Sequence, residues 1–335
     1  MPSPVSIKDL ATAAGVSHST VSRAIRGAGR VSAATRARIL TLAREMGYYP
    51  NEAARSLVMG RTKTIGVVVT TIGDPFVTQV VNGIEDAAHE AGYSVFLSSS
   101  RNQADREMAV VRVFRQRRVD AVIVTSSRVG SLYGDALAEF GVPIVLINSQ
   151  HEGRYLYSIA VDDTQGAELA VEHLLQLGHR RIGHIGSETR SVSCKRRKAG
   201  YRQALARRAV TPDPSLSVLP QAANDLSAGR LGLEMLLPAN PSAIFAYNDV
   251  IAIGALLEAR KQGIAIPDQV SLMGFDDIEA TEFVTPTLTT VRQPKADMGR
   301  AAVEMVLALL KGDEVSNRWL PGELVVREST TACPW

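Results

Sequence analysis

The sequence predicts an α/β protein with a small helical head and a larger body whose two lobes are built on parallel sheets. Residues 5–26 fit two short helices joined by a tight turn, whereas apolar runs alternate with amphipathic segments from Ile65 onward. The charged residues are also unevenly distributed along the chain. Residues 1–63 hold ten Lys and Arg against three Asp and Glu, a net charge of +7, whereas the net charge of the remaining residues is −4. A basic head on a mildly acidic body predicts a polyanion as the partner of the head, the alternative being a solvated basic surface.

A helix-turn-helix motif occupies the start of the chain. Its first helix would follow Ser6, and the small side chain of Ala11 would lie where the two helices cross. Gly15 would form the turn, because a positive φ is cheap only without a Cβ atom. Ser17 would cap the second helix, of which Val21 would be the buried anchor. A unit of this shape, with small polar residues and arginine on its outer face, fits the major groove of DNA.

A third helix and a short hinge helix would follow the motif. Ser32 is another N-cap candidate, and the apolar stripe after it predicts a helix that ends near Gly47. Pro50 interrupts the helical pattern, since the residue before a proline avoids the helical region. Residues 51–58 then fit a brief helix, and residues 60–63 fit a linker. Because a helix of about eight residues is unstable alone, we expect the hinge helix to need DNA or a partner helix.

The body is predicted from a change of pattern near Ile65. Apolar runs without alternation are typical of strands buried on both faces, which occur in parallel sheets covered by helices. These runs are too many for one sheet of usual size, so we expect two lobes, the second starting near Asp163. Leu288–Val291 and a helix at Met298–Leu310 would return the chain to the first lobe. The predicted strands are Ile65–Thr70, Ser94–Leu97, Ala121–Val124, Ile144–Ile147, Ile182–Ile185, Ala243–Ala246, Ser271–Phe275 and Glu323–Arg327.

The motifs of common enzymes and metal sites are missing from the sequence. It has no Gly-rich nucleotide loop after Ile65–Thr70, no His-Glu-x-x-His and no Gly-x-Ser-x-Gly, and its six histidines have no ligand spacing. Two cysteines exclude a disulfide framework and a multi-cysteine zinc site. We therefore predict no catalytic residue, no metal and no cofactor. Without a signal-peptide pattern or a run of about 18 apolar residues, we expect a cytoplasmic protein that does not enter a membrane.

Ordered motifs extend over nearly the whole chain. They are Ser6-Ile-Lys-Asp-Leu-Ala11, Ala14-Gly-Val-Ser-x-x-Thr-Val-Ser-Arg23, Gly47-Tyr-Tyr-Pro-Asn51, Ala53-Ala-Arg-Ser-Leu57, Thr64-Ile-Gly66, Asp74-Pro-Phe76, Gly178-His-Arg-Arg-Ile-Gly183, Arg197-x-x-Gly-Tyr201, Asn248-Asp249, Gly274-Phe-Asp-Asp277 and Leu288-Thr-Thr-Val-Arg-Gln-Pro294. Together they resemble the lactose/galactose repressor family of bacterial transcription regulators. The resemblance implies a body similar to periplasmic sugar-binding proteins, with a ligand held between two lobes.

The resemblance also implies roles for residues of the head and hinge. His18 and Ser19 match the residues that read bases at the start of the recognition helix, and Arg23 matches a base or phosphate contact. Leu57 matches a leucine that wedges into a central minor-groove step and bends the DNA. For the polar face of the second helix, the alternative is a solvated surface. The predicted DNA contacts are Ser6, Ile7, Ser17, His18, Ser19, Thr20, Ser22, Arg23, Arg26, Asn51, Ala54 and Leu57.

Nine residues match the ligand cleft of the family. An arginine and a carboxylate that project into one cleft suit a polyhydroxylated ligand, since each makes paired hydrogen bonds. For Asp276 the alternative is a cap at a strand end, and for Arg197 it is a solvated basic loop. The matching residues are Asp74, Phe76, Asn148, Ser191, Ser193, Arg197, Asn224, Asn248 and Asp276.

One cleft position departs from the family pattern. Counted from Gly229, the aromatic platform of the family falls at Asn224, whose side chain cannot stack on a sugar face or a purine. Ser191 is also small where purine-binding members carry a longer group. The departure disfavours a purine and favours a more polar ligand, such as a sugar acid or a polyol.

These arguments divide the chain into three domains. A helix-turn-helix domain would span residues 1–50, a hinge helix with its linker residues 51–63, and a ligand-binding and dimerisation domain residues 64–335. The first lobe of that last domain would comprise about 64–161 and 291–320, and the second about 162–290 and 321–335.

The sequence therefore predicts a ligand-controlled repressor that binds DNA as a homodimer. Two-fold symmetry predicts a near-palindromic operator, with one motif on each half-site. A sugar-like effector would change the angle between the lobes, so that the hinge helices pack or melt. No leucine heptad follows the last predicted strand, so a tetramer built by a C-terminal coiled coil is not expected. The alternatives are a solute-binding protein for transport and an α/β enzyme fused to a DNA-binding head.

Overall fold

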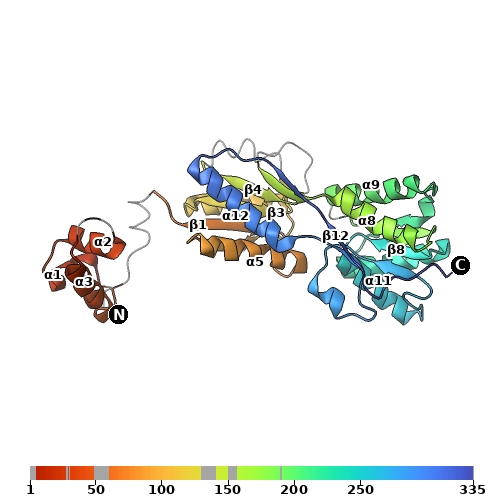
Figure 1. Ribbon diagram of the computed structural model, residues 1–335, viewed down its shortest axis with the longest axis horizontal. Helices are drawn as coiled ribbons and strands as arrows, with labels where there is room; N and C mark the ends of the chain where they lie inside the picture. Colours follow the sequence, from red (N-terminus) through yellow and green to blue (C-terminus); the bar gives the residue numbers. More distant parts are fainter. Residues whose placement is uncertain are drawn as a thin grey trace. The chain divides into compact units, whose positions relative to one another are not determined.

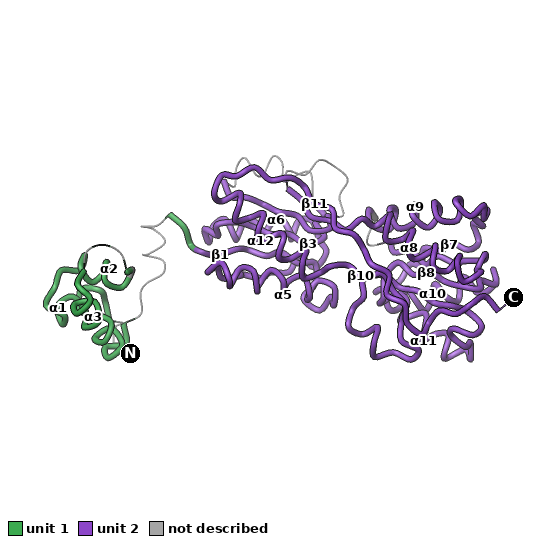
Figure 2. The backbone as a smooth tube through the Cα atoms, viewed as in Figure 1, with its two compact units in different colours: residues 1–62 green, residues 63–335 purple. Residues whose placement is uncertain are grey.

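The computed structural model describes most of the chain, in two compact units. The units comprise Met1–Thr62 and Lys63–Trp335 (Figure 2). The hinge helix predicted at 51–58 lies outside the described residues and stays a prediction. Within the described parts of the chain, every helix is too short or too polar to span a bilayer. The described residues are 5–27, 29, 31–48, 60–129, 141–149, 157–188 and 191–334.

Three helices form the first unit, and they begin at the caps that the sequence predicts. The Ser6 side chain accepts from the N–H of Asp9, whose carboxylate accepts in return from the N–H of Ser6. Gly15 has φ +62° in the turn, a conformation that favours glycine. Ser17 and Ser32 cap the next two helices by accepting from the N–H three residues later. The helices are α1 Ile7–Ala14, α2 His18–Arg26 and α3 Ala33–Glu45 (Figure 1).

A small hydrophobic core holds these three helices together. Leu10, Val21 and Ile39 are fully buried, which confirms Val21 as the anchor of the second helix. Ala11 is also buried, as expected of a small residue between crossing helices. Four alanines make up most of the rest of this core, so it buries little apolar area and its stability is marginal.

Six parallel strands form the sheet of the first lobe, in the order β11-β5-β4-β3-β1-β2. Helices α5 and α12 pack together over one face, and α6 covers the other. Figure 1 shows α5 and α12 beside each other. The elements are β1 Thr64–Val69, α5 Pro75–Glu90, β2 Ser94–Ser99, α6 Ala104–Gln116, β3 Ala121–Thr125, β4 Ile144–Ile147, β5 Ser158–Val161, α12 Lys295–Lys311 and β11 Arg318–Leu320.

Four parallel strands form the sheet of the second lobe, in the order β7-β6-β8-β9. Helices α8 and α9 cover one face, while α10 and α11 cover the other. A Cβ atom at Gly229 would lie 2.0 Å from the backbone oxygen of Ile251, so only glycine permits the close packing of α10 on α11. The elements are α8 Asp163–Gln176, β6 Ile182–Ile185, α9 Ser191–Arg207, β7 Ser217–Val218, α10 Asp225–Leu236, β8 Ala243–Ala246, α11 Asp249–Lys261 and β9 Ser271–Met273, with 3₁₀ turns at Pro214–Leu216, Leu237–Ala239 and Glu279–Glu282.

The described chain passes between the lobes three times. It first crosses where β5 ends at Val161 and α8 begins at Asp163. It returns through β10, Thr290–Arg292, to α12, and crosses again from β11 to β12, Glu323–Val325. Strands β10 and β12 pair antiparallel, so the second and third crossings form one two-stranded ribbon. A change at these crossings can alter the angle between the lobes.

The structure confirms the α/β fold class and corrects some predicted strands. The strand expected at Ser94–Leu97 is not buried on both faces, because β2 lies at the sheet edge and Phe96 is 45% exposed. The strand expected to reach Phe275 ends at Met273. Strands β5, β7 and β11 were not predicted, because none contains an apolar run long enough to stand out from its surroundings.

The predicted ends of three other elements are also corrected. The strand expected at Leu288–Val291 begins only at Thr290, because the ladder with β12 starts there. The last helix begins three residues before Met298, because Lys295, Ala296 and Asp297 carry no large apolar side chain that would extend the apolar stripe. The strand expected to reach Arg327 ends at Val325, where pairing with β10 stops.

Candidate functional site

The first half of α2 presents a polar face that the core of the head holds in place. Val21 and Ala24 are buried, whereas His18, Ser19 and Arg23 are exposed. Arg23 Nε donates to the backbone oxygen of Ser19 at 3.2 Å, which keeps the guanidinium group along the helix. An exposed helix N-terminus with hydroxyl, imidazole and guanidinium groups can contact phosphates and base edges.

Ser17 organises the start of this helix. Its Oγ accepts from the N–H of Thr20 at 3.2 Å and lies 2.8 Å from Ser19 Oγ and 2.9 Å from Thr20 Oγ1. Ser22, one turn further on, is half-buried. The hydroxyl groups of residues 17, 19 and 20 thus form a connected set. If a phosphate binds there, these hydroxyl groups would give up hydrogen bonds to one another and donate to the phosphate oxygens instead.

The other predicted DNA contacts have mixed surroundings. Ser6 is exposed and caps α1, and its hydrogen bonds lower the pKa of the Asp9 carboxyl below its ordinary value. Ile7 is half-buried against the core of the head, so part of its surface is unavailable to DNA. The side chain of Arg26 and the residues Asn51, Ala54 and Leu57 lie outside the described part of the chain, and their roles stay predictions.

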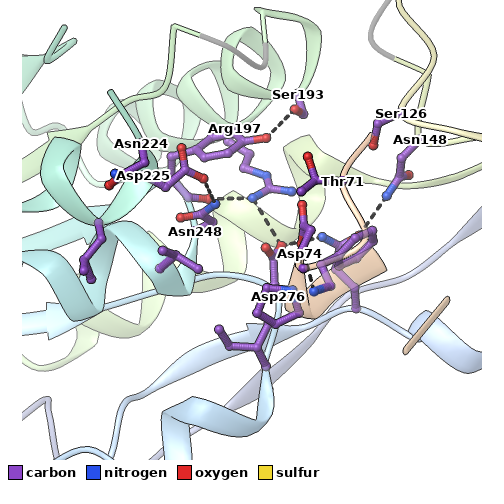
Figure 3. A pocket seen from close by; sticks show the side chains of 18 of the residues that line it. Thr71, Asp74, Ser126, Asn148, Ser193, Arg197, Asn224, Asp225, Asn248 and Asp276 are labelled. Carbon is purple, nitrogen blue, oxygen red and sulfur yellow. Dashed lines mark hydrogen bonds and ion pairs between the residues drawn. The ribbon is translucent and has the colours of Figure 1, made fainter. Parts of the chain in front are cut away.

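A pocket of about 440 Å³ is lined by residues of both lobes of the body (Figure 3). This volume is within the range of small-molecule sites. The structure brings eight of the nine predicted ligand residues together here, while the side chain of Ser191 is not described. The eight are Asp74, Phe76, Asn148, Ser193, Arg197, Asn224, Asn248 and Asp276.

Arg197 projects from α9 into a buried position at this pocket. Its Nε donates to Asp163 Oδ1 at 2.8 Å, and its Nη1 donates to the backbone oxygen of Tyr247 and, at 3.5 Å, to Asp276 Oδ1. The guanidinium carbon lies 3.7 Å from the ring centroid of Phe275. Burial disfavours the charged form, but Tyr247, Asp163 and Asp276 outweigh it, so the pKa of Arg197 rises above its ordinary value. The alternative of a solvated loop is therefore wrong.

Asp276 lies where the second lobe meets a crossing strand. Its Oδ1 accepts from Gln293 Nε2 at 2.6 Å, and its N–H donates to the backbone oxygen of Val291. The residue has φ +115°, which a side chain rarely adopts, so the surrounding structure holds it in place. Burial raises the pKa of Asp276 to about 6, although Arg197 and Gln293 oppose the shift. Its side chain pairs across the pocket and does not cap a strand.

Three of the helices that begin at the pocket are each capped by a predicted ligand residue. Asp74 Oδ1 accepts from two N–H groups of α5, the nearer that of Phe76 at 3.0 Å. Asn224 caps α10, and Asn248 caps α11 with Oδ1. Asn248 Nδ2 also donates to Asp225 Oδ2 at 2.7 Å. The capping side chains therefore have two roles, because they satisfy N–H groups at the helix N-termini and also form part of the pocket wall.

The remaining predicted residues belong to both lobes. Ser193 Oγ lies 2.6 Å from the hydroxyl group of Tyr247. Asn148 Nδ2 donates to Gln293 Oε1 at 3.2 Å, which joins the end of β4 to the second crossing. Phe76 packs in the core of the first lobe and offers an apolar wall. The pocket thus combines polar groups with two aromatic side chains, Phe76 and Tyr247.

Sequence reasoning missed six polar residues of the pocket, which are Thr71, Ser126, Asp163, Asp225, Tyr247 and Gln293. Asp163 follows the first crossing, and the predicted lobe boundary could have drawn attention to it. Gln293 lies within a motif that was recognised, and Tyr247 precedes Asn248. Asp225 stands in the first turn of α10 and carried no signal of its own.

Comparisons with known proteins agree with both units. The model for "Bacterial regulatory proteins, lacI family" matches residues 6–51, and that for "Periplasmic binding protein-like domain" matches residues 171–330. The chain is 35% identical over 335 residues to the HTH-type transcriptional repressor CytR of Escherichia coli (strain K12), covering 98% of this chain and 97% of CytR. It is 32% identical to the ribose operon repressor of Haemophilus influenzae, covering 96% and 98%. The lac repressor dimer bound to operator and the anti-inducer ONPF has a TM-score of 0.89 at 30% identity, covering 98% of this chain and 100% of that one.

The fold, the polar face of α2 and the pocket define a DNA-binding transcriptional regulator with a periplasmic-binding-protein-like body. The chain belongs to the lacI family of bacterial regulatory proteins. It is not an enzyme, because its relatives over nearly the full length are transcription regulators. The alternatives of a transport protein and a fused enzyme are therefore excluded.

Proposed function

We propose that the protein is a cytoplasmic repressor that binds a near-palindromic operator as a homodimer and responds to a small, sugar-like effector. The observation that carries the proposal is the buried Arg197, which joins Asp163, next to the first crossing, to Asp276, near the second. An effector that binds there contacts groups beside two crossings. It therefore favours one angle between the lobes, which is how a ligand shifts a two-state equilibrium.

The DNA-binding part of the proposal assigns one half-site to each head. His18 and Ser19 would contact base edges, while Arg23 and the hydroxyl groups at the start of α2 would contact bases or phosphates. A single small head makes few contacts, so a pair on a two-fold operator is needed for useful affinity. The predicted hinge contact of Leu57 would add affinity by bending the DNA.

The relatives support the dimer and the ligand class. The lac repressor was solved as a dimer on its operator. The transcriptional regulator CelR, 28% identical with a TM-score of 0.73 over 97% of this chain and 99% of that one, was solved with cellobiose. Arg197, Asp276 and the amides of Asn148 and Asn248 offer hydrogen bonds of the kind that bind such a polyhydroxylated molecule.

Fluorescence anisotropy with DNA from upstream of the protein's own gene tests the DNA-binding part. We expect salt-sensitive binding to a near-palindrome, with affinity falling steeply as salt rises. His18→Ala together with Ser19→Ala should reduce the preference for that site over unrelated DNA. Failure to bind any near-palindrome in a salt-sensitive manner would reject the proposal.

Two further variants separate DNA binding from the ligand response. Leu57→Ala should weaken operator binding while ligand affinity stays close to that of the unchanged protein. Asp276→Ala should abolish the ligand response and leave operator binding intact, because Asp276 lies in the body. A normal ligand response in Asp276→Ala would show that the assigned pocket is wrong.

A further inference from the structure

The charged side chains of the pocket do not balance. Among its described lining residues, Arg197 is the sole cation, and it faces four aspartates. Its Nε and Nη1 already donate to Asp163 and Asp276. Several carboxylates would therefore repel an anionic ligand. The one cation near it would attract it little, because the charge of that cation is already compensated by its own ion pairs. The four aspartates are Asp74, Asp163, Asp225 and Asp276.

Three of the helix N-termini at the pocket do not supply the missing positive charge. A helix N-terminus carries a partial positive charge that attracts anions. At α5, α10 and α11, however, N–H groups of the first turn already donate to Asp74, Asn224 and Asn248. The first turns of α10 and α11 also contain Asp225 and Asp249. These helix ends are therefore compensated within the protein.

A second buried cation, Lys295, directs its charge elsewhere. Its Nζ donates to the backbone oxygens of Asp276 and Asp277, and the residue does not line the pocket. It supports the segment that carries Asp276 and does not offer its ammonium group to a ligand. The described pocket wall thus keeps an excess of negative charge.

The hydrogen-bonding groups that lack a partner among the described residues lead to the same conclusion. Asp225 accepts from Asn248 through Oδ2, which leaves its Oδ1 available. Asp163 and Asp276 each use Oδ1 and keep Oδ2 available, whereas Arg197 keeps Nη2 as a donor. The charged side chains thus offer three acceptor oxygens against one donor nitrogen. A ligand has to supply donors, which hydroxyl groups do and ionised carboxylate or phosphate groups do not.

We propose that the pocket takes an uncharged polyhydroxylated ligand and rejects its carboxylated and phosphorylated analogues, with Asp225 as a residue that sets this selectivity. The inference rests on the proposed function, because it names the ligand class of the same pocket. It selects the polyol over the sugar acid that the sequence left open. Asp225 matters most because no described cation contacts it, unlike Asp163 and Asp276.

Thermal unfolding of the full chain with matched compounds tests the ligand class. A panel of neutral sugars and polyols is paired with the corresponding acids and phosphates, such as glucose with gluconate, glucuronate and glucose 6-phosphate. We expect a neutral member to raise Tm and its anionic partners to bind at least about tenfold more weakly.

The outcomes of this panel distinguish the inference from the proposed function. An anionic member that binds as tightly as its neutral partner, or better, would overturn the inference while the proposed effector function stands. If no member raises Tm or releases the protein from its operator, the effector function fails, and the inference fails with it.

A charge-neutral variant tests the role of Asp225. Asp225→Asn keeps the shape of the side chain and an acceptor oxygen for Asn248 but removes the negative charge. The ratio of the affinity for the neutral compound to the affinity for its anionic partner should therefore fall by about tenfold. Glu234→Gln removes the same charge from an exposed position of α10 and should leave the preference unchanged. If the two variants have the same preference as the unchanged protein, Asp225 does not set the selectivity.

Discussion

The head and the pocket hold their polar side chains in different ways. In the head, a hydrogen bond joins Ser17 to Thr20, three residues further along the chain. In the pocket, Arg197 reaches Asp163 and Asp276, which are 34 and 79 residues away. The difference teaches that the DNA-binding surface is a local structure, whereas the pocket exists only when both lobes and their crossings are in place.

This contrast predicts how far the effect of a substitution extends through the structure. A change in the head should act on one small cooperative unit, because its core and caps lie within about 40 residues of chain. A change in the pocket should affect several elements at once, since each side chain there joins helices and strands from different parts of the sequence. The following predictions test this contrast, from the largest expected effect to the smallest.

Removal of the buried arginine should have the largest effect. Arg197→Ala leaves Asp163 and Asp276 buried without their cation, at a cost of about 3–5 kcal/mol in the free energy of unfolding of the body. Arg207→Ala, at an exposed position of the same helix, should cost little, because its ion pair with Glu168 is solvated. Urea unfolding of the two variants measures the difference. Equal stability of the two would show that the buried pairs do not hold the lobe together.

Truncation in the small core should unfold the head alone. Leu10→Ala removes a fully buried side chain and should cost about 2–5 kcal/mol. Because the core is marginal, we expect operator binding to be lost while the body keeps its thermal transition and its ligand response. Calorimetry with separate ligand and DNA titrations checks this. A simultaneous loss of the ligand response would contradict the independence of the two units.

Loss of the helix cap should have a smaller effect. Ser17→Ala removes the acceptor for the N–H of Thr20 and should destabilise the head by about 1 kcal/mol. Ser19→Ala is the matched variant, since Ser19 is exposed and does not cap the helix. It should weaken operator binding with little change in the thermal transition of the head. Identical transitions for the two variants would mean that the cap adds nothing measurable.

Acidification should weaken ligand binding modestly. Burial raises the pKa of Asp276 from its ordinary 3.8 to about 6, against the opposing influence of Arg197, Gln293 and Lys295, and Asp74 adds to the rise. Between about pH 7 and about pH 5 the carboxylate takes up a proton and loses acceptor strength, so ligand affinity should fall several-fold. Calorimetric titration across this range measures it.

The effect of the same carboxyl on folding has the opposite sign. Its pKa is higher in the folded than in the unfolded chain, so protonation favours the folded state. The stability that Asp276 contributes is complete below about pH 4 and is lost as pH rises through about 6. Asp276→Asn should remove this dependence, and an unchanged profile in that variant would assign the titration to another group.

The head could be predicted in detail from the sequence. Its three helices begin at the expected caps, Gly15 has the expected positive φ, and Val21 is buried as expected. Most strands of the body were also found, because apolar runs such as Ile144–Ile147 are unmistakable. These features depend on interactions within a few residues, which a sequence pattern reports directly.

The pocket could be predicted only in part. The family resemblance pointed to Arg197 and Asp276, and the structure brings these two residues together. The resemblance did not identify Asp163 or Asp225. The sequence marked Asp163 only as the point near which the second lobe starts, and it gave no signal at Asp225. The edge position of Phe96 was missed for a related reason, since the order of strands in a sheet is set by how the whole chain winds.

By itself, the sequence determined the helix-turn-helix head, the alternation of strands and helices, and the membership of a repressor family, because caps, periodicity and ordered motifs act along the chain. Only the tertiary structure decided which carboxylates compensate Arg197, which acceptor oxygens remain available and, from these, the charge of ligand we propose. The physical reason is that these groups come from separate helices and crossing strands. Their spacing is set by the packing of both lobes, and their charges interact through space regardless of distance along the chain.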